Sequence, residues 1–104
     1  MFIELQRIIK KSDKDYRVEP IMVNISNILF IEDDHVAEKS IKEGKFVGLD
    51  SYKDTEFCTV TFKTGSEVNS MLTVGSKYHI ASRVREAKFD NSGTIFQGKK
   101  LLNG

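Results

Sequence analysis

The sequence predicts an α+β fold, in which a twisted antiparallel β-sheet, a meander of five or six strands, carries one amphipathic helix near its C-terminal end. Residues 23–32 indicate a strand, a tight corner and a second strand. Residues 58–65 indicate a strand that runs into a glycine turn. We expect these two segments to lie side by side in one sheet, with the helix packed on it.

Length and composition indicate a single globular domain. The chain has 104 residues, of which 39% are hydrophobic and 30% charged, a balance unlike that of disordered or membrane-spanning proteins. Its one cysteine, Cys58, cannot form an internal disulfide, which fits a reducing compartment. The first residues show no basic leader, and no run of roughly 20 apolar residues occurs, so we expect a cytoplasmic protein without a membrane segment.

Two strands are predicted in the N-terminal part of the chain. Residues 2–9 alternate imperfectly between apolar and polar side chains, as a half-buried strand does. A polar turn leads to a second extended segment, 16–23, which includes Pro20. Because proline cannot donate a backbone hydrogen bond, we expect Pro20 at a strand edge, a strand start or a bulge.

The corner at residues 24–27 contains asparagine and serine, whose side chains bond to the nearby backbone and favour tight turns. If this corner is one turn of 3₁₀ helix, Ile25 and Ile28 both point into the core. The next strand is expected at residues 29–31.

Residues 34–55 form a charge-rich insertion with few large apolar side chains. One interpretation is a two-turn helix over 36–43, anchored by Val36 and Ile41 and ended by a glycine. The other interpretation is a protruding hairpin with a short strand at 45–49.

The clearest strand covers residues 56–63, where β-branched and aromatic residues alternate between two faces. A glycine turn leads to a returning strand at 68–72. Residues 77–88 then predict a helix, because apolar residues recur there at helical spacing. The tail, residues 89–104, is expected to start with a turn at 89–93 and could add a last short strand at 94–97.

Charge is distributed unevenly along the chain, although the net charge is only +1. Residues 32–67 carry nine acidic and five basic side chains, a net charge of −4. Residues 68–104 carry six basic and two acidic side chains, a net charge of +4. The two segments could attract each other within one molecule or between two, or the basic end could bind an anionic partner.

The sequence shows no catalytic motif and no metal-binding pattern, so we predict no catalytic residue, no metal site and no cofactor. Residues 73–77 resemble a shortened phosphate-binding loop, because a strand is followed by glycine, serine and lysine at a helix start. The candidate anion- or phosphate-binding residues are Gly75, Ser76, Lys77, Tyr78, His79, Arg83 and Lys88. A simple helix cap beside a solvated helix face is the alternative.

The insertion and the tail contain more apolar side chains than a small sheet with one helix can bury. We therefore expect these side chains to cover a partner subunit in a homo-oligomer, or another protein. The candidate residues for this surface are Phe46, Val47, Leu49, Phe89, Ile95, Phe96, Leu101 and Leu102.

The order of strands and turns over residues 18–86, interrupted by the insertion, resembles that of the small flagellar FlbD-type proteins. The matching positions are 23–28, 31–32 and 59–65, with Val68, Ser76, Ile80 and Val84. This resemblance implies a short β-meander that ends in a helix, of a kind found among bacterial and phage proteins. Residues 28–32, followed by a strand pair and a late helix, are also similar to LytTR-type DNA-binding domains. Neither resemblance supplies a catalytic or binding residue.

We expect a non-enzymatic accessory or regulatory binding module of bacterial or phage type that acts as a homo-oligomer. One alternative is a nucleic-acid- or nucleotide-binding protein that uses the helix at 76–88 and the basic tail. A second alternative is a small enzyme.

Overall fold

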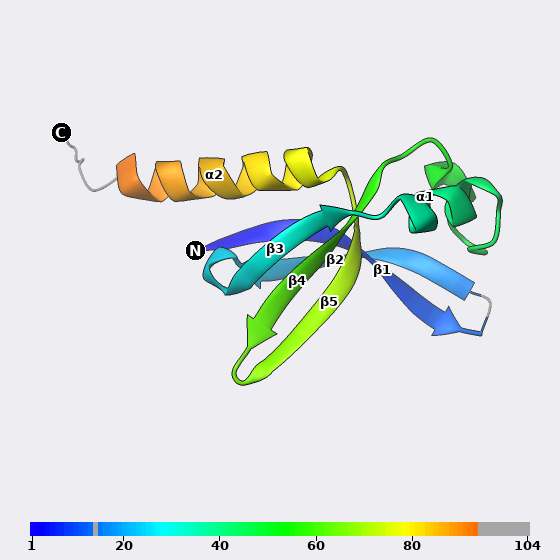
Figure 1. Cartoon of the computed structure of the whole chain (residues 1–104), viewed down its shortest axis with the longest axis horizontal. Coiled ribbons are helices and arrows are strands. Elements are labelled where there is room, and N and C mark those ends of the chain that lie inside the picture. The colour runs from blue at the N-terminus through cyan, green and yellow to red at the C-terminus, as the bar shows by residue number, and fades with distance from the viewer. Residues whose placement is uncertain (14, 94–104) are drawn as a thin grey trace.

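A computed structural model, which describes residues 1–13 and 15–93, confirms an α+β fold built on a five-stranded antiparallel sheet (Figure 1). The strands are β1 (Phe2–Ser12), β2 (Asp15–Asn24), β3 (Ile28–Asp33), β4 (Phe57–Thr64) and β5 (Glu67–Val74). The helices are α1 (His35–Lys42) and α2 (Lys77–Gly93), and the short 3₁₀ turns are η1 (Ile25–Asn27) and η2 (Asp50–Tyr52). The insertion therefore contributes a helix of its own, α1, besides the predicted C-terminal one.

The strand order is β2-β1-β5-β4-β3. Strands β3, β4 and β5 form the predicted meander, and Ile31 of β3 lies opposite Val60 of β4, which confirms that the two segments are neighbours. The β1–β2 hairpin does not continue this meander. It joins through β1 to β5, where Arg7 and Thr73 are in register, and it crosses the β4–β5 hairpin in Figure 1.

Consecutive strands β2 and β3 occupy opposite edges of the sheet, although only the three residues of η1 connect them. The sheet must therefore curl until its two edges approach each other at this corner. The Asn24 side chain accepts a hydrogen bond from the Ser26 amide at 3.0 Å, as the predicted turn chemistry requires. Ile25 is buried and Ile28 packs against the same core, so the predicted corner is confirmed.

One hydrophobic core lies between α2 and the sheet. Strand alternation brings apolar side chains from β1, β2 and β4 to this face, and Ile80 of α2 closes it. Val84 and Ala87 follow Ile80 on the same helical stripe, as the periodicity predicted. The buried members are Ile3, Leu5, Val23, Ile25, Cys58, Val60 and Ile80.

A second core lies on the opposite face of the sheet, under the insertion. Phe57 precedes Cys58 in β4 and therefore points to the other face, where it is fully buried with Ile41 and Leu49. The insertion thus covers the second face and does not protrude as a hairpin. Its helix is anchored by Ala37 and Ile41, whereas Val36, one of the two predicted anchors, is exposed.

Two carboxylates attach α1 to β4. Asp34 caps α1 by accepting a hydrogen bond from the Ala37 amide at 2.9 Å, and it also accepts one from the Thr59 hydroxyl at 3.2 Å. Glu38 accepts a hydrogen bond from the Phe57 amide at 2.8 Å. These bonds fix the start of the insertion against the sheet.

The far end of the insertion is attached to β2. The Tyr16 amide donates to the Val47 carbonyl at 2.8 Å, and Asp15 and Val47 form a single parallel bridge. Gly48 has a φ of +98°, and a Cβ atom there would collide with the Tyr16 carbonyl oxygen. Residues 45–49 therefore form a docked turn with one bridge rather than the predicted strand.

Helix α2 is longer than predicted. It begins at Lys77, as expected, but continues through 89–93, where the sequence suggested a turn. An established helix adds each further residue at little free-energy cost, so asparagine, serine and glycine near its end do not stop it at once. The strand predicted at 94–97 lies outside the described residues.

Candidate functional site

The two edges of the sheet differ in whether another strand could pair with them. Along β2, Val47 covers the end of the strand at Asp15, and Pro20 lacks an amide hydrogen to offer. Strand β3 has neither of these protections. Of these two edge strands, β3 is therefore the more open to pairing.

Backbone hydrogen-bonding groups of β3 point away from the sheet. The Asp34 amide donates to the Phe57 carbonyl at 3.1 Å, on the side of β4. Because bonding direction alternates along an antiparallel strand, the N–H and C=O groups of Ile31 and Asp33 face outward. Within residues 1–13 and 15–93, no backbone group bonds to this outer side of β3.

A β-bulge shapes the first half of the β3 edge. Ile28 lies opposite Phe62 and Phe30 opposite Thr61, so Leu29 is the extra residue. The bulge leaves Leu29 50% exposed, beside a Phe30 that is 52% exposed. Large apolar side chains at an open edge are unusual in a protein that works alone.

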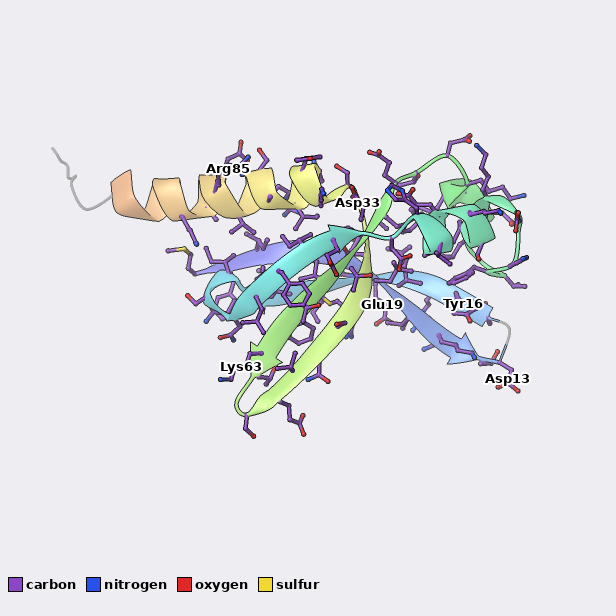
Figure 2. The ribbon with its side chains drawn as sticks, viewed as in Figure 1. Asp13, Tyr16, Glu19, Asp33, Lys63 and Arg85 are labelled. Atoms are coloured by element: carbon purple, nitrogen blue, oxygen red, sulfur yellow. The ribbon has the colours of Figure 1, made fainter. Side chains whose placement is uncertain are left out.

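A groove of about 350 Å³ runs between β3 and α2. Tyr78, 73% exposed, and Arg85 line it from α2, and residues of β3 line it from the sheet. Figure 2 marks the position of Arg85 on α2. The residues that line it are Ile28, Leu29, Phe30, Ile31, Lys77, Tyr78, Ala81 and Arg85. The groove therefore combines an apolar floor, two basic side chains and free backbone groups.

The amino-terminal end of α2 already holds an internal anion. The Asp33 carboxylate accepts a hydrogen bond from the Lys77 amide at 2.9 Å, and Ser76 accepts one from the His79 amide at 3.2 Å. Free amides at a helix start are what a phosphate would bind. Here two of them are bonded, so the helix-cap interpretation of Ser76 fits the geometry better than a phosphate site.

The predicted anion-binding residues do not gather in one place. At about 100° per residue, Lys77, Tyr78 and Lys88 lie on the groove side of α2, whereas His79 and Arg83 lie on its other flank. Gly75 has a φ of +116° and donates its amide to the Glu56 carbonyl at 2.8 Å, which serves the turn into α2.

The residues predicted for the partner surface do not form one exposed patch either. Leu49 is 1% exposed and belongs to the second core, so it cannot contact another subunit. Phe46 stacks on Tyr16 with ring centroids 4.4 Å apart, and only Val47 of the three insertion residues is largely exposed. The Phe89 side chain, Ile95, Phe96, Leu101 and Leu102 lie outside the described part of the structure.

Sequence reasoning missed the groove residues Leu29, Phe30, Ala81 and Arg85. A local signal for the first two was present, because residues 28–31 are apolar without interruption although they precede a charged segment. A strand with one solvated face would alternate between apolar and polar side chains. The uninterrupted run therefore marks Leu29 and Phe30, which stay about half exposed while Ile28 and Ile31 pack against the core.

Within the described residues, the fold shifts the pKa of the Cys58 thiol and of the His35 imidazole. Burial raises the pKa of the Cys58 thiol, which contacts the Thr73 hydroxyl at 3.2 Å, so this cysteine is a core residue and a poor nucleophile. A hydrogen bond to Glu38 at 3.0 Å raises the pKa of the exposed His35. No cluster of three potential metal ligands occurs among the residues that the structure describes.

A further groove, lined by polar side chains beside α1, mixes acidic and basic groups such as Glu38, Lys39, Lys53 and Glu56. Its opposed charges favour neither an anion nor a cation. No helix in the described ranges is both long and apolar enough to cross a membrane.

No family model, no curated protein and no solved structure matches this chain. The resemblances to FlbD-type and LytTR-type proteins therefore stay predictions.

Proposed function

We propose that this protein is a non-enzymatic binding module that holds an extended segment of protein chain against the outer edge of β3. The segment would pair with the backbone of Ile31 and Asp33 as an added strand. Its side chains would enter the groove between β3 and α2. Lys77 and Arg85 on the helical wall favour a segment that carries acidic residues.

The observation that carries this proposal is the contrast between the two edges. Proline and a covering segment protect β2, as is usual for edges that must not associate. Strand β3 instead presents Leu29, Phe30 and free backbone groups beside an apolar groove. A soluble module keeps such an edge open at a risk of aggregation, which a binding role explains.

The alternatives draw less support from the geometry. Asp33 occupies the helix start at which a phosphate would bind, and the basic residues of α2 are spread over two flanks. A nucleic-acid-binding surface gathers its cations along one path. For a small enzyme, no buried ionisable pair or reactive thiol within residues 1–13 and 15–93 favours a reaction.

A library of random peptides displayed on phage and selected against the full chain tests the proposal. We expect enrichment of extended peptides that combine apolar and acidic residues. Phe30→Lys should reduce their affinity at least about tenfold, because it places an ammonium group at the strand edge. Val68→Lys is the matched control, since Val68 is an equally exposed strand residue on β5.

A second variant, Tyr78→Ala, changes the groove from the helix and leaves the sheet intact. Circular dichroism establishes that each variant is folded. The proposal is wrong if no peptide is enriched, or if the enriched peptides bind Phe30→Lys and Tyr78→Ala as well as they bind the unchanged chain.

A further inference from the structure

We infer that residues 45–47 form a strap over the first half of the β2 edge, and that this strap opens while both hydrophobic cores stay in place. The closed strap keeps β2 from pairing with another strand. Its opening exposes a stretch of β2 that ends at Pro20. This inference concerns β2 and goes beyond the function proposed for β3.

Alternation along β2 decides which backbone groups face away from β1. The Tyr16 amide donates to the Val47 carbonyl at 2.8 Å, so the backbone groups of Tyr16 face outward. The register with β1 runs without a shift from Tyr16 to the end of β2, and every second residue of an antiparallel strand faces outward. Val18 and Pro20 therefore face outward too, and proline is tolerated in a strand at such positions.

The closed strap leaves one free amide in this part of the edge. Val47 occupies the Tyr16 amide, and Gly48 lies so close to the Tyr16 carbonyl oxygen that a Cβ atom would collide with it. Pro20 has no amide hydrogen, so only Val18 offers one between the strap and the proline. When the strap opens, Tyr16 and Val18 offer successive outward amides, the pattern with which an added strand pairs.

Two glycines bound the strap and supply its hinges. Gly44 has a φ of +79° and Gly48 a φ of +98°, conformations that other residues rarely adopt. Ile41 and Leu49, which lie outside the strap, are each 1% exposed and hold the insertion in the second core. Because glycine backbones rotate at little steric cost, the strap can lift between these two anchors without moving either of them.

The strap is attached to β2 at Tyr16 and its neighbour. Besides the hydrogen bond to Val47, the ring of Phe46 stacks on that of Tyr16, and Asp15 forms a single bridge with Val47. Figure 2 marks Tyr16 at the end of β2 that lies beside the insertion. Lys45 and Val47 are exposed, so lifting the strap uncovers little apolar surface besides Phe46. Such a segment opens at a lower free energy than the whole domain unfolds.

Amide hydrogen exchange of the full chain, followed by NMR, tests whether the strap opens separately. The Tyr16 amide should exchange when the strap opens, whereas the Val60 amide in the central strand β4 should exchange only when the domain unfolds. Gly48→Ala destabilises the closed strap, so it should speed exchange at Tyr16 at least about tenfold.

Gly65→Ala is the matched control for the exchange experiment. It weakens the domain at a distant turn, where nothing lies within 4 Å of the added atom. Because it affects the open and the closed strap equally, it should speed exchange at Val60 and leave exchange at Tyr16 unchanged. Equal acceleration of Tyr16 and Val60 by Gly65→Ala overturns the separate opening.

Sedimentation velocity tests whether the opened edge pairs. The measurements use Phe30→Lys chains, in which a charge blocks the β3 edge. These chains should sediment as 11.8 kDa monomers, and so should the same chains with Gly65→Ala. Adding Phe46→Ala and Gly48→Ala opens the strap, so the sedimentation coefficient should rise with protein concentration as the β2 edges of two copies pair.

Val18→Pro separates edge pairing from general aggregation. The Val18 amide faces outward, so proline at this position costs no hydrogen bond to β1. Added to the strap-open variant, Val18→Pro should return the chain to a monomer, with circular dichroism establishing that each variant is folded. A strap-open variant that stays monomeric overturns the inference, as does an association that Val18→Pro leaves unchanged.

Discussion

At the scale of single residues, the fold is held by polar side chains that each connect distant parts of the chain. Glu38 bonds to the Phe57 amide and to the His35 imidazole, and Asp33 joins the end of β3 to the start of α2. Thr73, fully buried, donates to the Cys58 carbonyl at 3.2 Å and contacts its sulfur. The contacts of Thr73 satisfy polar groups that would otherwise be buried without partners.

Cys58 provides a probe of global opening. Its side chain is fully buried, and burial raises the pKa of the thiol, so both access and thiolate formation are suppressed in the folded state. We predict that a thiol reagent modifies Cys58 only at the rate at which the protein unfolds. Labelling measured with increasing urea should follow the unfolding transition, and rapid labelling in native buffer would contradict the buried placement.

His35 contributes to the stability of the fold in a pH-dependent way. Glu38 raises the pKa of His35 above its ordinary value of 6.5, so the ion pair contributes fully below that value and is lost as pH rises through the folded pKa. Proton NMR titration should show Glu38→Gln returning the His35 pKa toward 6.5. Glutamine at position 38 keeps an oxygen that can accept the hydrogen bond of the Phe57 amide. Glu38→Ala loses this oxygen, so it should lower the free energy of unfolding by about 1 kcal/mol more than Glu38→Gln does.

At the scale of elements, the insertion is a part of the fold rather than an appendage. Ile41 and Leu49 complete a core with Phe57 on the face of the sheet that α2 does not cover. Gly48 allows the chain to approach Tyr16 closely enough for the Tyr16 amide to bond to Val47. The insertion therefore depends on one glycine at its point of contact with β2.

Gly48→Ala should weaken this docking. Both the positive φ and the collision of Cβ with the Tyr16 carbonyl oppose alanine, so we expect a loss of about 2 kcal/mol or more in urea unfolding. Gly65→Ala is the control, because its φ of 62° is also positive but nothing lies within 4 Å of the added atom. Gly65→Ala should lower the free energy of unfolding by only about 1 kcal/mol. Equal losses in both would show that contact with Tyr16 is unimportant.

The elements themselves were largely predictable from local patterns. Alternation defined β4, asparagine and serine defined the corner before β3, and apolar spacing defined the start of α2. The placement of the insertion was not predictable, because alternation shows which residues share a face but not what covers it. Alternation places Phe57 on the face opposite Cys58, yet no local pattern indicates that Ile41 and Leu49 bury it.

The candidate site was harder to predict because it depends on contacts between distant residues. The Asp33 carboxylate reaches the Lys77 amide across 44 positions, and this bond alone changes the interpretation of the helix start. The groove arises only when α2 lies along β3. Local sequence marked the apolar run at 28–31 but not the helix that faces it.

At the scale of the whole molecule, two cores lie on opposite faces of one sheet. The radius of gyration of the chain, 16.3 Å, exceeds the roughly 13 Å expected of a compact domain of about 100 residues. The cores share β1, β2, β4 and β5, since neighbouring residues on these strands point to opposite sides. Loss of either core should therefore remove support from the same strands.

We predict a single cooperative unfolding transition in urea. Cys58 labelling reports the core under α2, and tyrosine fluorescence is sensitive to the second core through Tyr16 and Tyr52. Phe57→Ala should lower the free energy of unfolding by about 3–5 kcal/mol and shift both midpoints equally. Two separate midpoints would mean that the cores unfold independently.

The unequal protection of the two sheet edges also determines how far assembly can proceed. A sheet with two accessible borders can recruit neighbours without end and grow into a fibre. Here Pro20 and Val47 hinder pairing along one of the two borders. Fibre growth that needs both β2 and β3 is therefore opposed at β2.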